Sequence, residues 1–189
     1  DADRHGWLRY RAMKKAIRQG LPVVLDAGAL SLVSLTTGPT LITPHYRELH
    51  RLLLSRDITV TATAIEGDPK KWAGIAAKEF GVAVLLKGNV TVVASNESQI
   101  QLSASSTWLA TAGTGDVLAG ILGALIATQS LEIEKNPDIL PAIVATGALI
   151  HARAADLASA GGPITAMAGI FLARCLSFVS KLRVIISLY

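Results

Sequence analysis

The sequence predicts an α/β domain in which helices cover both faces of a mostly parallel sheet. Short apolar runs that favour strands alternate with longer stretches that have helical spacing, and the chain then continues with apolar helical segments. That order of elements is typical of layered α/β folds. The length of 189 residues favours one domain, and a composition that is 51% hydrophobic and 17% charged allows a sizeable core.

The first part of the chain supplies strands that end near polar residues. The expected elements are, in order, a helix over 7–19, a strand over 22–25, a helix over 30–35 and a strand over 40–42. Thr43 and Pro44 are predicted to be the N-cap and first residue of the next helix. Asp68 and Pro69 repeat this device at the start of a helix that runs to Phe80.

The second part begins with a strand and two turns and ends in helices. The expected elements are a strand over 82–86, turns at 87–89 and 96–98 that lead into strands over 90–94 and 99–103, and helices over 116–128, 137–160 and 165–180. The polar stretch 130–138 is the clearest loop, and 182–188 is an apolar, β-rich tail.

The stretch Gly113-Thr114-Gly115-Asp116 leads directly into an apolar helical run. Glycines allow backbone turns that a Cβ would hinder and let a ligand approach closely. The first helical turn has N–H groups without helical partners, and with the helix dipole they favour an anion. Asp116 can there take a proton from a hydroxyl that attacks a phosphoryl group. The alternative is a glycine turn with a carboxylate that stabilises the helix N-terminus.

Three further polar residues follow predicted strands, and ligands bind at the carboxyl ends of strands in such sheets. Asp26, His45 and Lys87 would meet the glycine turn there. Each also has a structural interpretation: Asp26 as a helix cap, which is favoured, His45 as a surface helix residue, and Lys87 as a solvated strand end. His151 lies in an apolar helix, where a hydrogen-bonded core histidine is expected.

Charge and cysteine content limit the class of protein. The net charge of +4 and the pI near 9.4 favour anionic ligands but are too small to predict nucleic-acid binding. The single cysteine, Cys175, provides no disulfide framework and no cysteine metal site, so we expect a cytoplasmic protein. The apolar runs 117–128 and 139–150 are shorter than the roughly 20 residues of a membrane span, and therefore predict buried helices.

Four motifs occur together in a specific order. They are Leu41-Ile42-Thr43-Pro44-His45 with Glu48, Val84-Leu85-Leu86-Lys87-Gly88 with Thr91, the glycine-rich stretch from Leu109 to Gly120, and His151-Ala152-Arg153-Ala154-Ala155-Asp156. Over about residues 20–168 they resemble the ADP/ATP-dependent NAD(P)H-hydrate dehydratases of the ribokinase-like superfamily. The resemblance implies a three-layer α/β/α ribokinase-like domain and a homo-oligomer, with a tetramer expected.

The resemblance also implies a repair reaction. Hydrated NADH or NADPH would be phosphorylated on the ring hydroxyl by ADP or ATP, and phosphate would then leave to restore the double bond. Asp116 would contact the hydrate and act as base, and His45 would bind the hydrate. Glu48 would hold Mg²⁺ through water. The anion hole would be Gly113, Thr114 and Gly115, and the nucleotide would contact Lys87, Gly88, Asn89, Val90, Thr91 and Gly115.

The chain departs from the family pattern in places. Family members usually read Asp-Ala-Asp where this chain has Asp26-Ala27-Gly28, and many carry a small residue in place of Arg47. We expect residues 1–189 to be one domain that lacks its N-terminal part, with 171–189 as an atypical tail. Two alternatives remain: a ribokinase-superfamily kinase acting on a thiazole or pyrimidine alcohol, and a truncated nucleotide-binding protein without catalysis.

Overall fold

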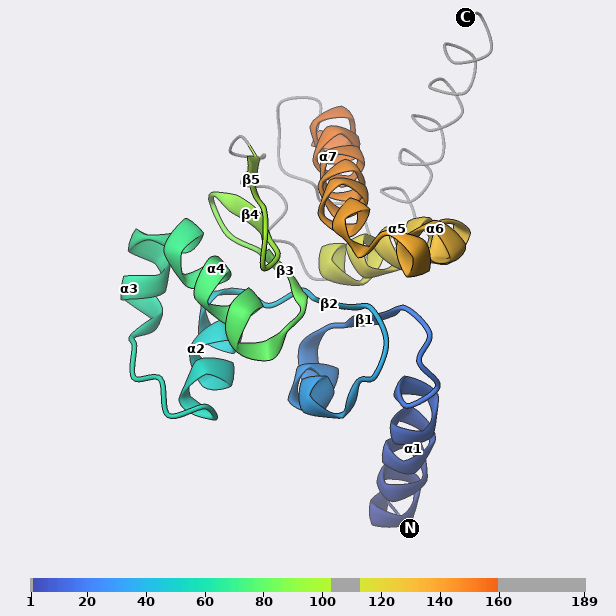
Figure 1. Cartoon of the computed structure of the whole chain (residues 1–189). Helices are drawn as coiled ribbons and strands as arrows, with labels where there is room; N and C mark the ends of the chain where they lie inside the picture. The colour runs from blue at the N-terminus through green and yellow to red at the C-terminus, as the bar shows by residue number, and fades with distance from the viewer. Residues whose placement is uncertain (1, 103–112, 160–189) are drawn as a thin grey trace, which may run out of the picture.

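The computed structural model describes residues 2–102 and 113–159 and contains a mixed five-stranded sheet in the order β1-β2-β3-β4-β5 (Figure 1). The strands are β1 (Val23–Leu25), β2 (Thr40–Ile42), β3 (Ala83–Leu86), β4 (Thr91–Ala94) and β5 (Gln99–Leu102). Pairing is parallel from β1 to β3 and antiparallel from β3 to β5. The parallel strands and both predicted turns are therefore confirmed.

Helices cover both faces of this sheet, as predicted. One face carries η1 (Ala27–Leu35), α2 (Tyr46–Leu54), α3 (Ala62–Gly67) and α4 (Pro69–Phe80). The other carries α5 (Thr114–Thr128), α6 (Ser130–Lys135) and α7 (Leu140–Ser159), which follows the short η3 (Pro137–Ile139). Successive strand residues point to opposite faces, so Val84 packs into the first core and Leu85 into the second. Both side chains are fully buried.

The parallel register brings three strand ends to one edge of the sheet. Leu25 lies opposite Ile42, and Ile42 lies opposite Val84. An additional parallel bridge between His45 and Lys87 extends the pairing beyond β2 and β3. This edge is where the polar residues that follow the strands gather.

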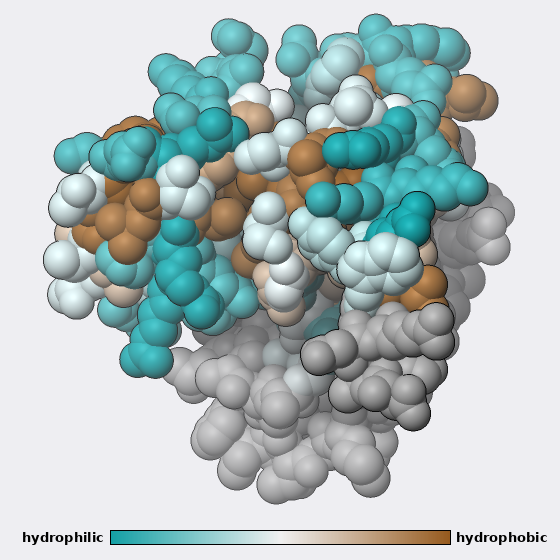
Figure 2. Space-filling view, turned by 90° about the horizontal axis from the view of Figure 1, so that it is seen from below, coloured by the Kyte–Doolittle hydropathy of each residue, from teal (hydrophilic) through white to brown (hydrophobic). Residues whose placement is uncertain are grey.

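Helix α1 (Ala2–Ile17) extends away from the sheet and contacts η1 (Figure 1). Ile17 is buried, whereas Trp7, Leu8 and Met13 are exposed. Figure 2 views the molecule from below, and there hydrophobic side chains form separate groups among hydrophilic ones. The helix begins before residue 7, where the sequence pattern placed its start.

Two sequence predictions for local structure are wrong. The N-cap of α2 is His45, not Thr43, because the Thr43 side chain is buried against Asp26 instead of capping the helix. The predicted loop over 130–138 contains α6 and η3, because Ile133 is fully buried in the second core and orders the segment. The predicted helix over 165–180, the tail over 182–188 and Cys175 lie outside the described residues.

Helix α7 confirms the predicted helix over 137–160 and is longer than the apolar run 139–150 inside it. Within the described residues, the stretch Pro137–Leu157 is long and apolar enough to cross a membrane by length and composition alone. However, 50% of its most apolar window is buried inside the protein. It packs against α5 and against β3, β4 and β5, as a core helix does.

Candidate functional site

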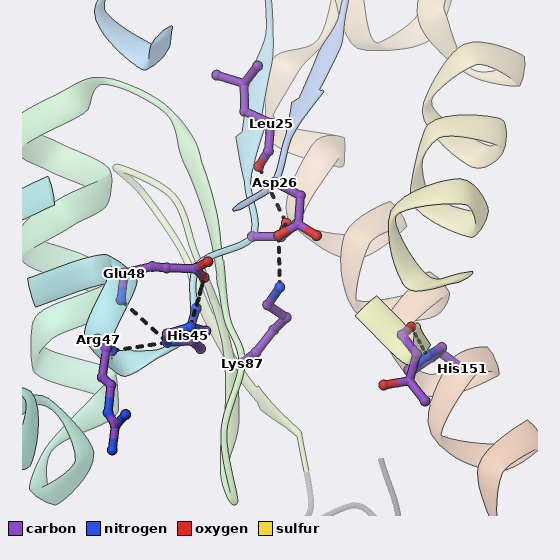
Figure 3. Close-up of polar contacts among 9 residues, drawn as sticks. Leu25, Asp26, His45, Arg47, Glu48, Lys87 and His151 are labelled. Atoms are coloured by element: carbon purple, nitrogen blue, oxygen red, sulfur yellow. Dashed lines mark hydrogen bonds and ion pairs between the residues drawn. The ribbon is translucent and has the colours of Figure 1, made fainter. Parts of the chain in front are cut away.

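The centre of the candidate site is an ion pair between the ends of β1 and β3. Lys87 Nζ donates to Asp26 Oδ1 at 2.8 Å, and Thr43 Oγ1 donates to the same oxygen at 2.8 Å (Figure 3). The side chains are partly shielded, with 25% of Lys87 and 19% of Asp26 exposed, while Thr43 is 1% exposed. Asp26 occupies the N-cap position of η1 but makes no capping hydrogen bond with its side chain. Its carboxylate serves the strand edge, and the capping interpretation of this residue is wrong.

The backbone of Lys87 and the turn after it are held against the end of β2 and the start of α2. Lys87 N donates to Pro44 O at 2.8 Å. A Cβ on Gly88 would overlap the Tyr46 hydroxyl, so any larger residue here would have to displace the tyrosine side chain. Burial raises the pKa of Tyr46 above 10.0, although backbone hydrogen bonds with Val90 and Asn89 act in the opposite direction. The turn that follows β3, which the sequence predicts to bind the nucleotide, therefore packs against the start of α2.

His45 and Glu48 form a capping box at the start of α2 (Figure 3). His45 Nδ1 accepts from Arg47 N at 3.1 Å and Glu48 N at 3.4 Å, and Glu48 Oε2 accepts from His45 N at 2.9 Å. Since Nδ1 accepts, a neutral imidazole carries its proton on Nε2, which lies 3.5 Å from Glu48 Oε2. The His45 side chain is 48% exposed, so its ring both caps the helix and faces solvent beside Lys87.

The glycine motif forms the N-terminus of α5. Gly113 has φ 88°, a left-handed conformation that glycine adopts without steric cost, and it is the N-cap. As a glycine, this N-cap provides no capping side chain, and the positive end of the α5 dipole lies at the strand edge, beside Asp26 and Lys87. A Cβ built on Gly115 would lie 3.8 Å from both Asp26 Oδ2 and Lys87 Nζ. Gly115 therefore places the α5 N-terminus directly beside the ion pair, with Asp116 exposed in the same turn.

His151 supports this turn from α7. It is 5% exposed, and its Nε2 lies 2.8 Å from the carbonyl oxygen of Thr114. Because a carbonyl only accepts, Nε2 carries the proton. Desolvation by burial lowers the pKa of His151 from 6.5 to about 4, with a smaller contribution from the Lys87 charge and against the hydrogen bond to Thr114. The prediction of a hydrogen-bonded core histidine is confirmed.

The described residues contain no group of three His, Cys, Asp or Glu side chains that would hold a metal ion by themselves. A Mg²⁺ ion that keeps its waters and binds substrate phosphates needs only one or two carboxylates. Asp26, Glu48 and Asp116 carry carboxylates at this edge, and Glu48 uses Oε2 in the capping box. The donor set therefore fits an ion bound mainly through water and phosphate.

The structure brings together residues that the sequence singled out separately. Lys87 and Gly115, both assigned to the nucleotide, lie side by side, and His45 is bridged to Lys87. Thr43 is the residue that sequence reasoning missed as a site residue, because it was assigned to a helix cap. The one available signal was its place directly after a strand.

The sequence is similar to that of one family of known proteins. A family model described as NAD(P)H-hydrate dehydratase matches residues 3–173. The bifunctional NAD(P)H-hydrate repair enzyme Nnr of Corynebacterium glutamicum is 36% identical over 159 residues, which cover 73% of this chain and 28% of that protein. The ADP-dependent (S)-NAD(P)H-hydrate dehydratase of Neisseria meningitidis serogroup B is 36% identical over 156 residues, covering 77% of this chain and 48% of that protein.

A solved structure shows the same architecture. The ADP/ATP-dependent NAD(P)H-hydrate dehydratase from Bacillus subtilis, co-crystallised with ATP and Mg²⁺, superposes with a TM-score of 0.68 at 24% identity. The match covers 91% of this chain and 58% of that chain. It confirms the predicted ribokinase-like α/β fold. The chain spans less than two thirds of the length of each of these proteins.

Proposed function

Because the chain belongs to the NAD(P)H-hydrate dehydratase family, we propose that it restores NADH and NADPH from their hydrates in a reaction that consumes ADP or ATP. The observation that carries this proposal is the position of Gly115 beside both Asp26 and Lys87. It puts a helix N-terminus and an ammonium at one place, and both favour a phosphoryl group.

The nucleotide would lie along the turn that follows β3. Lys87 supplies a positive charge to a phosphate, and Gly88 to Thr91 offer backbone and small side chains for the rest of the nucleotide. The anion hole formed by Gly113, Thr114 and Gly115 would stabilise the charge that develops on the transferring phosphoryl group. The α5 dipole acts in the same direction, since its positive end faces this edge.

Asp116 would act as the general base. It takes the proton of the ring hydroxyl while the hydroxyl oxygen attacks the terminal phosphorus of the nucleotide. The bond from that phosphorus to its bridging oxygen breaks, and AMP leaves from ADP or ADP leaves from ATP. Phosphate then leaves the ring with the electron pair of its C–O bond, and loss of a proton from the neighbouring ring carbon forms the double bond.

His45 and Glu48 would hold the other reactant and the cation. The exposed side of the His45 ring would contact the hydrate. A Mg²⁺ ion would screen the phosphate charges when it is bound. Glu48 would hold it through a water molecule on Oε1, because Oε2 accepts the His45 N–H.

We further propose a cytoplasmic homo-oligomer. The nicotinamide coenzymes and adenine nucleotides that it would use are cytoplasmic metabolites, and the single cysteine suits a reducing compartment. A tetramer is expected, and light scattering coupled to size exclusion measures it.

Replacement of Asp116 tests the proposed chemistry. Asp116→Asn keeps the size of the side chain but cannot accept the hydroxyl proton, so turnover of hydrated NADPH should fall by ~10²–10⁴-fold while ADP affinity stays near the native value. Recovery of the dihydronicotinamide absorbance measures turnover, and calorimetry measures ADP binding. Native turnover in the variant would reduce Asp116 to a stabiliser of α5. A phosphorylated hydrate that accumulates without recovery of absorbance would instead indicate a small-molecule kinase.

A further inference from the structure

Lys87 is fixed by two contacts, unlike a solvated lysine at the end of a strand. Its Nζ is 2.8 Å from Asp26 Oδ1, and its backbone N–H is fixed on Pro44 O at 2.8 Å. The ammonium group and the backbone of Lys87 are therefore both held, although a lysine side chain is flexible by itself. Figure 3 shows the ammonium pointing from the end of β3 toward the end of β1.

The Asp26 carboxylate that pairs with this ammonium is itself oriented by Thr43. Thr43 donates to Asp26 Oδ1 at 2.8 Å, and Thr43 N donates to Leu25 O at 3.1 Å. Thr43 is 1% exposed, and of the two acceptors within reach of its hydroxyl, Asp26 Oδ1 at 2.8 Å is nearer than Leu25 O at 3.4 Å. The chain of contacts runs from the β1–β2 pairing through Thr43 to Asp26 and on to Lys87.

The same carboxylate faces the glycine turn. Its second oxygen, Oδ2, and Lys87 Nζ are each 3.8 Å from the position a Gly115 Cβ would take. An anion bound at the first turn of α5 would therefore sit next to the ammonium without any movement of the lysine backbone. A preoriented charge loses less freedom on binding than one that must be collected from solvent.

We propose that Asp26, oriented by Thr43, is the positioning residue that holds the Lys87 ammonium at the N-terminus of α5 for a nucleotide phosphate. The inference rests on the proposed function only in so far as it takes the ligand to be a nucleotide. Asp26 does not donate to the phosphate; it acts through Lys87, and its own negative charge makes it an unfavourable neighbour for an anion.

Asp26 could either position the Lys87 ammonium or compete with phosphate for it, and the two roles predict different effects on ADP binding. If Asp26 positions Lys87, the lysine contributes most to ADP binding when Asp26 is present. If Asp26 merely competes with phosphate for the ammonium, removal of Asp26 frees the lysine, and the lysine then contributes more. The two possibilities predict opposite signs for the coupling between the residues.

A double-mutant cycle determines the sign of the coupling between Asp26 and Lys87. The ADP affinity of each variant of the 189-residue chain is measured by calorimetry. We expect Lys87→Ala to weaken ADP binding about tenfold in the native background and by less than about twofold in the Asp26→Ala background. An equal or greater loss in the Asp26→Ala background would overturn the inference, and so would a native chain that binds no ADP.

Conservative variants separate positioning from folding. Asp26→Asn keeps an oxygen that accepts from Thr43 and Lys87, so the effect of Lys87→Ala should return to about fivefold. If Asp26→Ala does not fold, Thr43→Val provides the cycle, because it removes the hydroxyl and leaves the ion pair. An Asn variant that behaves like the Ala variant in its coupling to Lys87 would count against positioning.

A matched control lies on α6. Lys135 Nζ is 2.9 Å from Glu132 Oε1, on a helix that follows the opposite end of α5. Lys135→Ala should leave ADP affinity unchanged with or without Glu132→Ala. If the predicted cycle is observed but hydrated NADPH is not dehydrated, the proposed function fails while the assignment of Asp26 stands.

Discussion

Burial of His151 makes the stability of the protein depend on pH. The pKa falls from 6.5 in the unfolded chain to about 4 in the fold, so between these values the unfolded state binds the proton and the folded state does not. Stability is complete above about pH 6.5 and is lost as pH falls toward about 4. The shift corresponds to a total of about 3 kcal/mol, of which about 2.5 kcal/mol is lost by about pH 4.5.

The substitution His151→Leu removes this dependence. At about pH 7.5 the variant should be less stable than the native chain, since the hydrogen bond to the Thr114 carbonyl is lost, a cost of about 1–3 kcal/mol. At about pH 4.5 the gap in free energy of unfolding should shrink by about 2.5 kcal/mol, so the two proteins become similar in stability. Urea unfolding followed by circular dichroism at both pH values measures the gap.

Comparing variants cancels the titration of the other groups. Ile126→Ala is the control, because Ile126 is 3% exposed in the second core and carries no ionisable group. Its cost of about 2–5 kcal/mol should be the same at both pH values. If the His151→Leu gap also stays constant within about 0.5 kcal/mol, His151 is not held neutral by burial and the reasoning is refuted.

Three other predictions concern the elements around the site. His45→Ala should lower the free energy of unfolding by about 1 kcal/mol and the Tm by about 2–4 °C, whereas His45→Asn, which can still cap α2, should not; equal melting curves would contradict the capping role. Gly113→Ala should cost about 1–2 kcal/mol and weaken ADP binding, while Gly120→Ala, which meets nothing within 4 Å, should do neither. Gly88→Ala should weaken ADP binding because its methyl overlaps the Tyr46 hydroxyl and the end of its ring, and Tyr46→Ala in the same chain should restore part of the loss; no restoration would exclude that contact as the cause.

Local patterns carried most of the fold prediction. The turn at Lys87-Gly88-Asn89 predicted two strands in succession, and the structure contains these strands as an antiparallel pair. His151 was interpreted correctly because a histidine in an apolar helix has few alternatives to a buried hydrogen bond. Where competing local signals met, prediction failed: Thr43 and His45 both suit an N-cap, and the tertiary contact of Thr43 decided between them.

The contacts that define the site are not local. Asp26 meets Thr43 across 17 positions and Lys87 across 61 positions, and no periodicity or motif spacing reports such a contact. The sequence placed Asp26 and Lys87 at the same edge by topology, yet favoured a capping role for Asp26. Likewise, the polarity of 130–138 predicted a loop, because the burial of Ile133 depends on the helices around it.

Turnover of hydrated NADPH by the native chain, with ADP and then ATP as the second substrate, tests the central claim most directly. The dihydronicotinamide absorbance should recover, and one nucleotide should be consumed for each coenzyme restored. Recovery of absorbance should require the nucleotide, because phosphate leaves the ring much more readily than hydroxide does. Nucleotide consumption without any recovery of absorbance, or no consumption with either nucleotide, would contradict the proposed dehydration.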